Sequence, residues 1–228
     1  MNIVRPFLAA ALLLGAAPAF AQSGVTPTAT PARGAAQLVA LLASDETITR
    51  LAGRMFDANL SKTELLPAET RTLFARDPAL KQHVAGRTRS ALTLIVGREL
   101  PSLRTQLSAL FAEGMTAQEI AETLTFFNTP TGQKMVAQIY RGVGESGALD
   151  ERQAEKAAMQ ALMSSLAPED YGVMLSFGGT SAAQKLQALD PRIRAISRAW
   201  GQDVIARNEA RLVHTVRQAV AEYPGKKP

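Results

Sequence analysis

Apolar residues return at helical spacing along most of this 228-residue chain, and this period constrains the fold more than any other feature. They recur every three or four positions between Leu80 and Phe111, and again between Ile193 and Val220. Such spacing places them on one face of an α-helix, whereas no stretch alternates apolar and polar residues for long enough to predict a strand. Aromatic residues make up only 5% of the chain, which suits contacts between Ala- and Leu-rich helices. The sequence therefore predicts an all-α fold, a multi-helix bundle.

Capping residues and prolines predict where the helices begin and end. Asp77 followed by Pro78 is typical of the N-cap and first turn of a long helix. Pro101 lies inside this helix and predicts a kink, or a break and restart, near Glu99–Pro101. We expect Gly114 to close the helix, because glycine suits the left-handed position at a helix C-terminus.

Further boundaries follow along the chain. Thr116 and Glu119 have the spacing of a capping box and predict a helix that ends at about Phe127. The glycine-rich segment 142–147 predicts a flexible linker between two helices. The pair Asp190-Pro191 predicts the start of a long C-terminal helix. The apolar stripe of that helix consists of Ile193, Ile196, Trp200, Val204, Leu212, Val216 and Val220.

The first 21 residues predict a cleavable signal peptide. A single basic residue, Arg5, precedes the apolar run Phe7–Ala17, and small residues precede a predicted cleavage site after Ala21. The run is shorter than the roughly 20 residues that a bilayer core requires, so a transmembrane anchor is the less favoured alternative. The rest is predicted as a disordered lead-in at 22–34, a single helical domain at 35–223 and a disordered tail at 224–228. We therefore expect a periplasmic or secreted protein.

No residue pattern in the chain predicts a reaction. The sequence has no cysteine, which excludes disulfides, thiolate-bound metals and catalytic thiols. Its two histidines, His83 and His214, are far apart and lack the spacing of a metal motif. Nucleophile elbows, phosphate-binding loops and dinucleotide fingerprints are absent from the sequence. We therefore predict a non-enzymatic protein with no catalytic residue, cofactor or metal ligand.

Two segments offset by 51 residues resemble each other, Met115–Lys134 and Leu166–Lys185. The matching pairs are Leu124 with Leu175, Phe126 with Phe177, Thr129 with Thr180, and Gln133-Lys134 with Gln184-Lys185. Each segment predicts a helix, a tight turn and a second helix capped by threonine. This pattern predicts a helix-turn-helix pseudo-repeat at about 115–139 and 166–189. Chance similarity between two Ala-rich helical pairs is the alternative.

The turn of the first repeat carries a distinctive motif, Phe126-Phe127-Asn128-Thr129-Pro130-Thr131-Gly132-Gln133-Lys134. It resembles the signature of domain of unknown function 2059, a family of exported helical bacterial proteins, and the likeness is sharpest over about residues 107–139. The chain departs from the family pattern in having Phe127-Asn128 where Tyr is common, and Gln133 before the lysine. The resemblance implies a helical fold and an envelope location, and it implies no catalytic residues.

Packing and capping account for this motif without a ligand. Its six candidate residues are Phe126, Phe127, Thr129, Pro130, Gly132 and Lys134. We expect Thr129 to accept hydrogen bonds from free backbone amides of the next helix, and Gly132 to admit a close neighbour. The alternative is an anion site, because a helix N-terminus with Lys134 one turn in is suited to hold one.

Charge is unevenly distributed along the chain. Residues 105–190 carry five basic and ten acidic groups, a net of −5, whereas residues 191–228 carry eight basic and three acidic groups, a net of +5. Arg207, Arg211 and His214 lie on one face of the C-terminal helix and predict a basic surface. The alternative is an ordinary solvated helix face.

These features favour a non-enzymatic binding or accessory module of the envelope, which engages a protein partner or an apolar ligand between helices. A peripheral membrane or cell-wall protein is the alternative, with the basic C-terminal helix binding anionic lipid or cell-wall polymer. Nucleic acid is a less favoured partner, because the basic face has no interleaved aromatic residues. An enzyme with an unrecognised carboxylate site is the third hypothesis.

We predict that the mature protein begins at Gln22, because Ala19 and Ala21 are the small residues that signal peptidase requires before its cleavage site. N-terminal sequencing of the protein recovered from the periplasmic fraction measures this directly. An intact Met1 in the membrane pellet would contradict the prediction.

Overall fold

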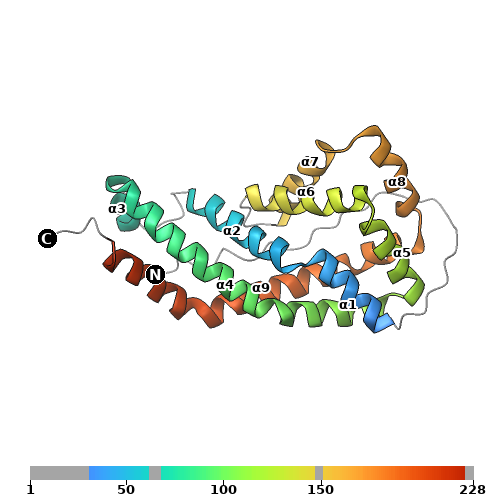
Figure 1. Ribbon diagram of the computed structural model, residues 1–228, viewed down its shortest axis with the longest axis horizontal. Coiled ribbons are helices and arrows are strands. Elements are labelled where there is room, and N and C mark those ends of the chain that lie inside the picture. The colour runs from blue at the N-terminus through green and yellow to red at the C-terminus, as the bar shows by residue number, and fades with distance from the viewer. Residues whose placement is uncertain (1–30, 62–67, 147–150, 224–228) are drawn as a thin grey trace.

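The computed structural model describes residues 31–61, 68–146 and 151–223, and within these ranges it consists of helices without a strand (Figure 1). The helices are α1 (Pro31–Leu42), α2 (Asp45–Ser61), α3 (Ala68–Arg76), α4 (Pro78–Gly114), α5 (Ala117–Phe127), α6 (Pro130–Ser146), α7 (Glu151–Met163), α8 (Pro168–Gly178) and α9 (Ser181–Ala221). The predicted all-α bundle with a long C-terminal helix is confirmed. The predicted signal peptide, residues 22–30 of the lead-in and the tail at 224–228 lie outside the described residues.

The two longest helices, α4 and α9, lie side by side along the long axis of the molecule (Figure 1). The α1–α2 pair packs against α4, and α5 contacts α1, α6 and α9 at one end. Helix α6 packs against α2, and α7 packs against α6. The α6–α8 segment therefore forms a second layer on one side of the bundle.

The predicted caps at Asp77 and Thr116 are confirmed. Asp77 Oδ1 accepts a hydrogen bond from the Leu80 amide at 2.9 Å, at the start of α4. At the start of α5, Thr116 Oγ1 accepts from the Glu119 amide at 3.2 Å, and Glu119 Oε2 accepts from the Thr116 amide at 2.8 Å. Both groups satisfy backbone amides that a helix N-terminus leaves without an internal partner.

Helix α4 runs through Pro101 without a break, so the predicted restart is wrong. Leu100 and Leu103, on either side of the proline, are fully buried in the main core. We infer that this burial outweighs the one backbone hydrogen bond that proline removes. Gly114 does end the helix, but the extended residue is Met115 and Gly114 is not left-handed. Its role is steric, because a Cβ there would lie 2.7 Å from Leu189 Cδ2 in α9.

Helix α9 begins at Ser181, so the predicted start at Asp190-Pro191 is wrong. Leu186, Leu189 and Ile193 are buried and follow one face of the helix across the proline. Because this apolar face is continuous and buried, α9 remains a single helix at Pro191, where the sequence alone suggests that a helix begins. Asp190 caps no helix, and its carboxylate accepts a hydrogen bond from Arg194 Nε at 2.7 Å.

Two glycine-containing segments are also helical where the sequence predicts otherwise. Helix α1 begins at Pro31, so residues 31–34 of the predicted lead-in are ordered against α5. A Cβ on the buried Gly34 would lie 2.9 Å from Ile120 Cγ2. The predicted linker at 142–147 is helical to Ser146, because Gly142 lets α6 approach α7 closely. A Cβ on Gly142 would lie 2.4 Å from the Ala157 carbonyl oxygen.

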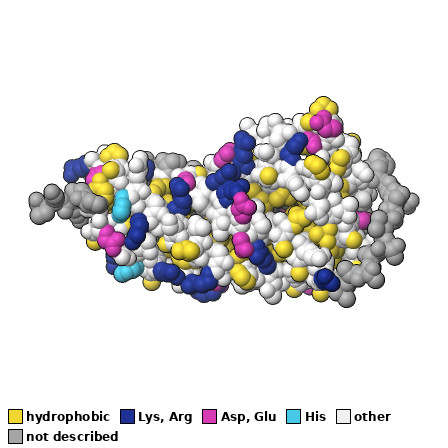
Figure 2. Space-filling model, viewed as in Figure 1, with side chains coloured by type: hydrophobic (Ala, Val, Ile, Leu, Met, Phe, Trp, Pro, Cys, Tyr) yellow, Lys and Arg dark blue, Asp and Glu magenta, His cyan; other side chains and the backbone are white. Residues whose placement is uncertain are grey.

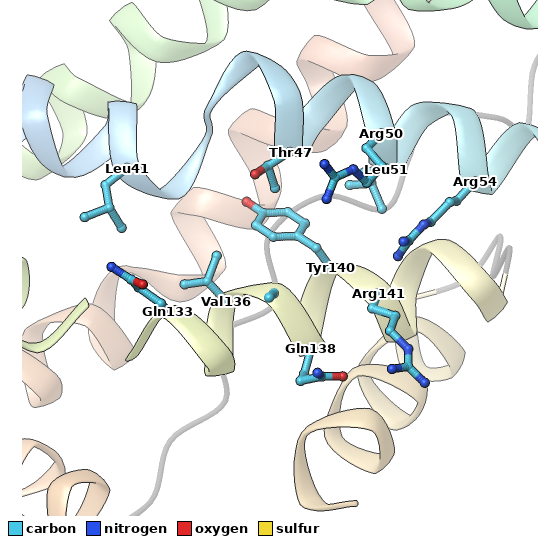
Figure 3. A pocket seen from close by; sticks show the side chains of 11 residues that line it. Leu41, Thr47, Arg50, Leu51, Arg54, Gln133, Val136, Gln138, Tyr140 and Arg141 are labelled. Carbon is cyan, nitrogen blue, oxygen red and sulfur yellow. The ribbon is translucent and has the colours of Figure 1, made fainter. Parts of the chain in front are cut away.

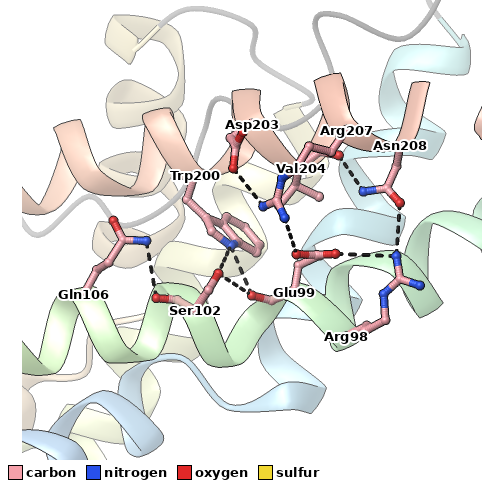
Figure 4. Close-up of polar contacts among 9 residues, drawn as sticks. All are labelled: Arg98, Glu99, Ser102, Gln106, Trp200, Asp203, Val204, Arg207 and Asn208. Atoms are coloured by element: carbon pink, nitrogen blue, oxygen red, sulfur yellow. Dashed lines mark hydrogen bonds and ion pairs between the residues drawn. The ribbon is translucent and has the colours of Figure 1, made fainter. Parts of the chain in front are cut away.

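Trp200 joins α9 to α4 at the middle of the bundle, as the stripe on α9 predicts (Figure 4). Its side chain is buried, and the indole Nε1 donates to the Glu99 carbonyl at 3.2 Å and to Ser102 Oγ at 3.1 Å. A buried indole needs such a partner. This contact fixes the register between the two longest helices.

Because Trp200 is the only tryptophan, its fluorescence reports this contact. We predict blue-shifted emission from the native protein and a red shift when urea unfolds the chain, since burial removes the indole from water. The red shift should coincide with the loss of helical circular dichroism. Red-shifted emission from the folded protein in buffer would contradict the packing of α9 on α4.

Candidate functional site

The predicted motif forms the turn between α5 and α6. Thr129 Oγ1 accepts from the Gly132 amide at 3.0 Å and donates to the Phe126 carbonyl at 2.7 Å. Gly132 faces the end of α5 so closely that a Cβ would lie 2.2 Å from the Phe126 carbonyl oxygen. Capping by Thr129 and the close approach at Gly132 therefore have the structural roles expected from the sequence.

The turn between α8 and α9 has the same geometry. Thr180 Oγ1 accepts from the Ala183 amide at 3.2 Å and donates to the Phe177 carbonyl at 2.8 Å. The residue before each threonine has nearly the same backbone angles, φ −83° and ψ −11° at Asn128 and φ −83° and ψ −7° at Gly179. The pseudo-repeat is therefore present in the backbone as well as in the sequence.

The two repeats meet through their equivalent phenylalanines. The rings of Phe126 and Phe177 stack with centroids 4.1 Å apart and an interplanar angle of 6°. Phe127 lies edge-on to both rings, with centroids 5.0 Å from Phe126 and 6.2 Å from Phe177. Phe126 and Phe127 are buried in the main core. The aromatic part of the motif thus joins one repeat to the other.

A buried carboxylate of α8 forms the polar half of the same contact. Asp170 is only 4% exposed. Its carboxylate accepts from Lys134 Nζ at 2.6 Å, from the Ala167 amide at 2.9 Å and from Thr131 Oγ1 at 2.8 Å. These hydrogen bonds, with that from Lys134 the strongest, lower the pKa of Asp170 to about 2. The ammonium of Lys134, which the sequence suggests as part of an anion site, is therefore paired with the carboxylate of Asp170 in the same chain.

The predicted basic surface is exposed, but its residues differ in their pairing. Arg207, Arg211 and His214 are all exposed on α9. Arg207 forms ion pairs with Glu99 of α4 at 3.1 Å and with Asp203 at 2.8 Å (Figure 4). Its charge is therefore largely balanced within the bundle, so it contributes little to a basic surface.

A groove between α2 and α6 is the feature that the sequence analysis missed (Figure 3). It has a volume of about 330 Å³. Its lining residues are Leu41 of α1, Thr47, Arg50, Leu51 and Arg54 of α2, and Gln133, Val136, Ala137, Gln138, Tyr140 and Arg141 of α6. On the surface, basic side chains gather over α2 and the end of α6, beside hydrophobic side chains in the hollow toward α1 (Figure 2).

The groove has a cationic end and an apolar end (Figure 3). Arg50, Arg54 and Arg141 lie at one end, whereas Leu41 and Val136 lie at the other. Arg50 pairs with Glu46, and Arg141 pairs with Glu145 at 3.1 Å, and all four side chains are more than half exposed. Such surface pairs are weak and exchange readily with other partners. Within the described residues Arg54 forms no ion pair.

Tyr140 fixes the middle of the groove. Its hydroxyl donates to the Leu42 carbonyl at 2.8 Å, and burial raises the pKa of this phenol above its ordinary value. The tyrosine is therefore neutral and ties α6 to the end of α1. The groove residues of α6 recur at helical spacing from 133 to 141. The sequence shows this face of α6 but does not show that α2 lies opposite it.

In the described ranges, no group of three or more His, Cys, Asp or Glu residues has the arrangement of a metal site. None of the described helices is both long and apolar enough to cross a membrane. His83 lies against Tyr223, with ring centroids 5.7 Å apart.

Residues 101–141 match the model of a family described as an uncharacterized protein conserved in bacteria (DUF2059). This match confirms the resemblance seen in the motif, and it covers α4 from Pro101 to its end, α5 and the groove face of α6. No curated protein and no solved structure matches the chain.

We predict that Asp170→Asn lowers the stability of the protein near neutral pH, because the neutral amide loses the ion pair with Lys134. The native pKa of Asp170 lies below its unfolded value, so the stability it contributes is present above about pH 4 and is lost as the pH falls toward 2. The difference in unfolding free energy between parent and variant should therefore shrink over this range. Urea titrations at several pH values measure it.

Lys134→Met tests the cause of this effect, because it removes the strongest of the hydrogen bonds that lower the pKa of Asp170. Its stability difference from the parent should shrink over the same range of pH. A difference that stays constant from pH 6 to pH 2 in both variants would contradict the role of the ion pair.

Proposed function

We propose that this chain is an exported, non-enzymatic binding module of the bacterial envelope, and that the groove between α2 and α6 is its ligand site. The observation that carries the proposal is the groove, which brings five apolar or aromatic residues together with three arginines and three uncharged polar residues. Small-molecule sites are concave and largely pre-formed, and their polar groups orient the ligand. Export is supported by the signal-peptide pattern in residues 1–21.

The packing around the groove favours a binding role. Tyr140 and Leu51 anchor opposite sides of it in the main core, so its walls are held by the same contacts that hold the bundle together. A rigid, partly apolar groove loses little conformational entropy when a ligand enters. The family match extends to residue 141, so it includes the α6 side of this site.

Attachment to a membrane or cell wall through the basic face of α9 is the second candidate. It is supported by the exposure of Arg211 and His214, and weakened by the ion pairs that occupy Arg207. Only part of the predicted basic surface is therefore available to an anionic polymer.

Photocrosslinking in the native envelope tests the proposal against this alternative. A benzophenone amino acid replaces Ala137, which is exposed in the groove, or Ala210, which is exposed on α9 beside Arg211. We expect a specific adduct after irradiation of cells that carry the probe at position 137. Intact-protein mass spectrometry gives the mass of a small ligand, and a gel shift reveals a protein.

The variant at position 210 is the matched control, since both substitutions lie on exposed helical alanines. Adducts at position 210 alone would favour the basic face of α9 and contradict the groove. The absence of an adduct at either position would contradict both candidates.

A further inference from the structure

We infer that the groove between α2 and α6 binds a single-chain amphiphile that has one anionic headgroup. This inference rests on the proposed function and adds the chemical class and the orientation of the ligand. The headgroup lies among the arginines, and the chain extends past Tyr140 toward Leu41 and Val136 (Figure 3).

The anionic headgroup follows from the charges at one end of the groove. Arg54 lies between Arg50 and Arg141 and has no acidic partner among the described residues. A guanidinium presents a planar fork of donors that matches a carboxylate or a phosphate. Glu46 pairs with Arg50 and Glu145 pairs with Arg141, so neither carboxylate is paired with Arg54. An anion is therefore the group that completes the charge balance at Arg54.

Gly144 holds Arg54 in this position. A Cβ at residue 144 would lie 3.0 Å from Arg54 Cβ and 3.2 Å from Arg54 Cδ, so the aliphatic part of the arginine packs directly on the backbone of α6. The side chain is half-buried, and its guanidinium lines the groove. A packed stem restricts the rotamers of a long side chain, which lowers the entropy lost when it binds an anion.

The apolar chain of the ligand is inferred from the side chains at the opposite end of the groove. Leu41 and Val136 line the groove there, next to the Tyr140 ring. The Tyr140 hydroxyl is already bonded to Leu42, so it offers the ligand a ring and no free polar group. Burial of an alkyl chain against these side chains is favourable.

The size of the groove suits a ligand with one chain. Its volume of about 330 Å³ is at the lower end of the range for small-molecule sites. A medium-chain fatty acid has the required charge, a single chain and a comparable size.

Isothermal titration calorimetry on the mature protein tests the inference with decanoate, kept below its micelle-forming concentration. We expect one decanoate per chain. Acetate lacks the chain and decyltrimethylammonium carries the opposite charge, so both should bind at least about tenfold more weakly. Arg54→Gln should weaken decanoate binding about tenfold or more, because a hydrogen bond to a charged partner is lost.

Two further variants keep the result interpretable. Ala137→Glu places a negative charge in the groove at an exposed position and should also weaken binding. It keeps the inference testable if Arg54→Gln disturbs the fold. Arg211→Gln removes an arginine of α9 outside the groove and should leave binding unchanged.

The outcomes separate this inference from the proposed function. Equal binding of decanoate by the parent and both groove variants would overturn the inference, as would no binding of decanoate at all. An adduct at position 137 in cells would then still support the groove as a site for another ligand. Salt-sensitive flotation with anionic vesicles that is lost in Arg211→Gln, together with no decanoate binding, would favour the membrane surface instead.

Discussion

The stack between Phe126 and Phe177 is the contact on which the arrangement of the second layer depends. The two rings occupy equivalent positions of the pseudo-repeat and lie 4.1 Å apart, so the turn before α6 is fixed against the turn before α9. Asp170 adds a polar contact from α8 to the first turns of α6 through Thr131 and Lys134. The position of α6 follows from these contacts, and α6 supplies one wall of the groove. The motif therefore affects the site through the placement of α6. None of its six candidate residues lines the groove, whereas Gln133, which lies within the motif sequence, does.

The two repeats have the same turn geometry, but the first helix of each repeat is buried to a different extent. In the first repeat, Ile120 of α5 is 1% exposed and packs against Gly34 of α1. Its equivalent in the second repeat is Tyr171 of α8, which is 45% exposed. Because few apolar side chains of α8 are buried, that helix depends on the phenylalanine stack and on the ion pair of Asp170. A segment held by so few contacts opens locally at a lower free energy than the core of the bundle.

Local signals predicted the helices correctly where a cap or a period decides the structure, and failed where tertiary packing decides it. Asp77, Thr116 and Thr129 each satisfy amides within three residues, so the sequence contains the whole interaction. Pro101 and Pro191 remain inside helices because buried aliphatic residues on both sides pack each helix against its neighbours. No local rule gives this result, since the partner surfaces come from distant parts of the chain.

The glycines of α6 also show that local sequence rules do not predict tertiary contacts, and the groove depends on such contacts. Gly142 and Gly144 are common in flexible segments, yet here each one lets a neighbouring helix approach, α7 at Gly142 and Arg54 of α2 at Gly144. The absence of a side chain at each glycine leaves room for the neighbouring helix. Helix α6 continues past these glycines to Ser146, and its residues from 133 to 141 form one face opposite α2. The arginines that define the cationic end come from helices far apart in sequence, so their convergence depends on a contact that only the folded chain reveals.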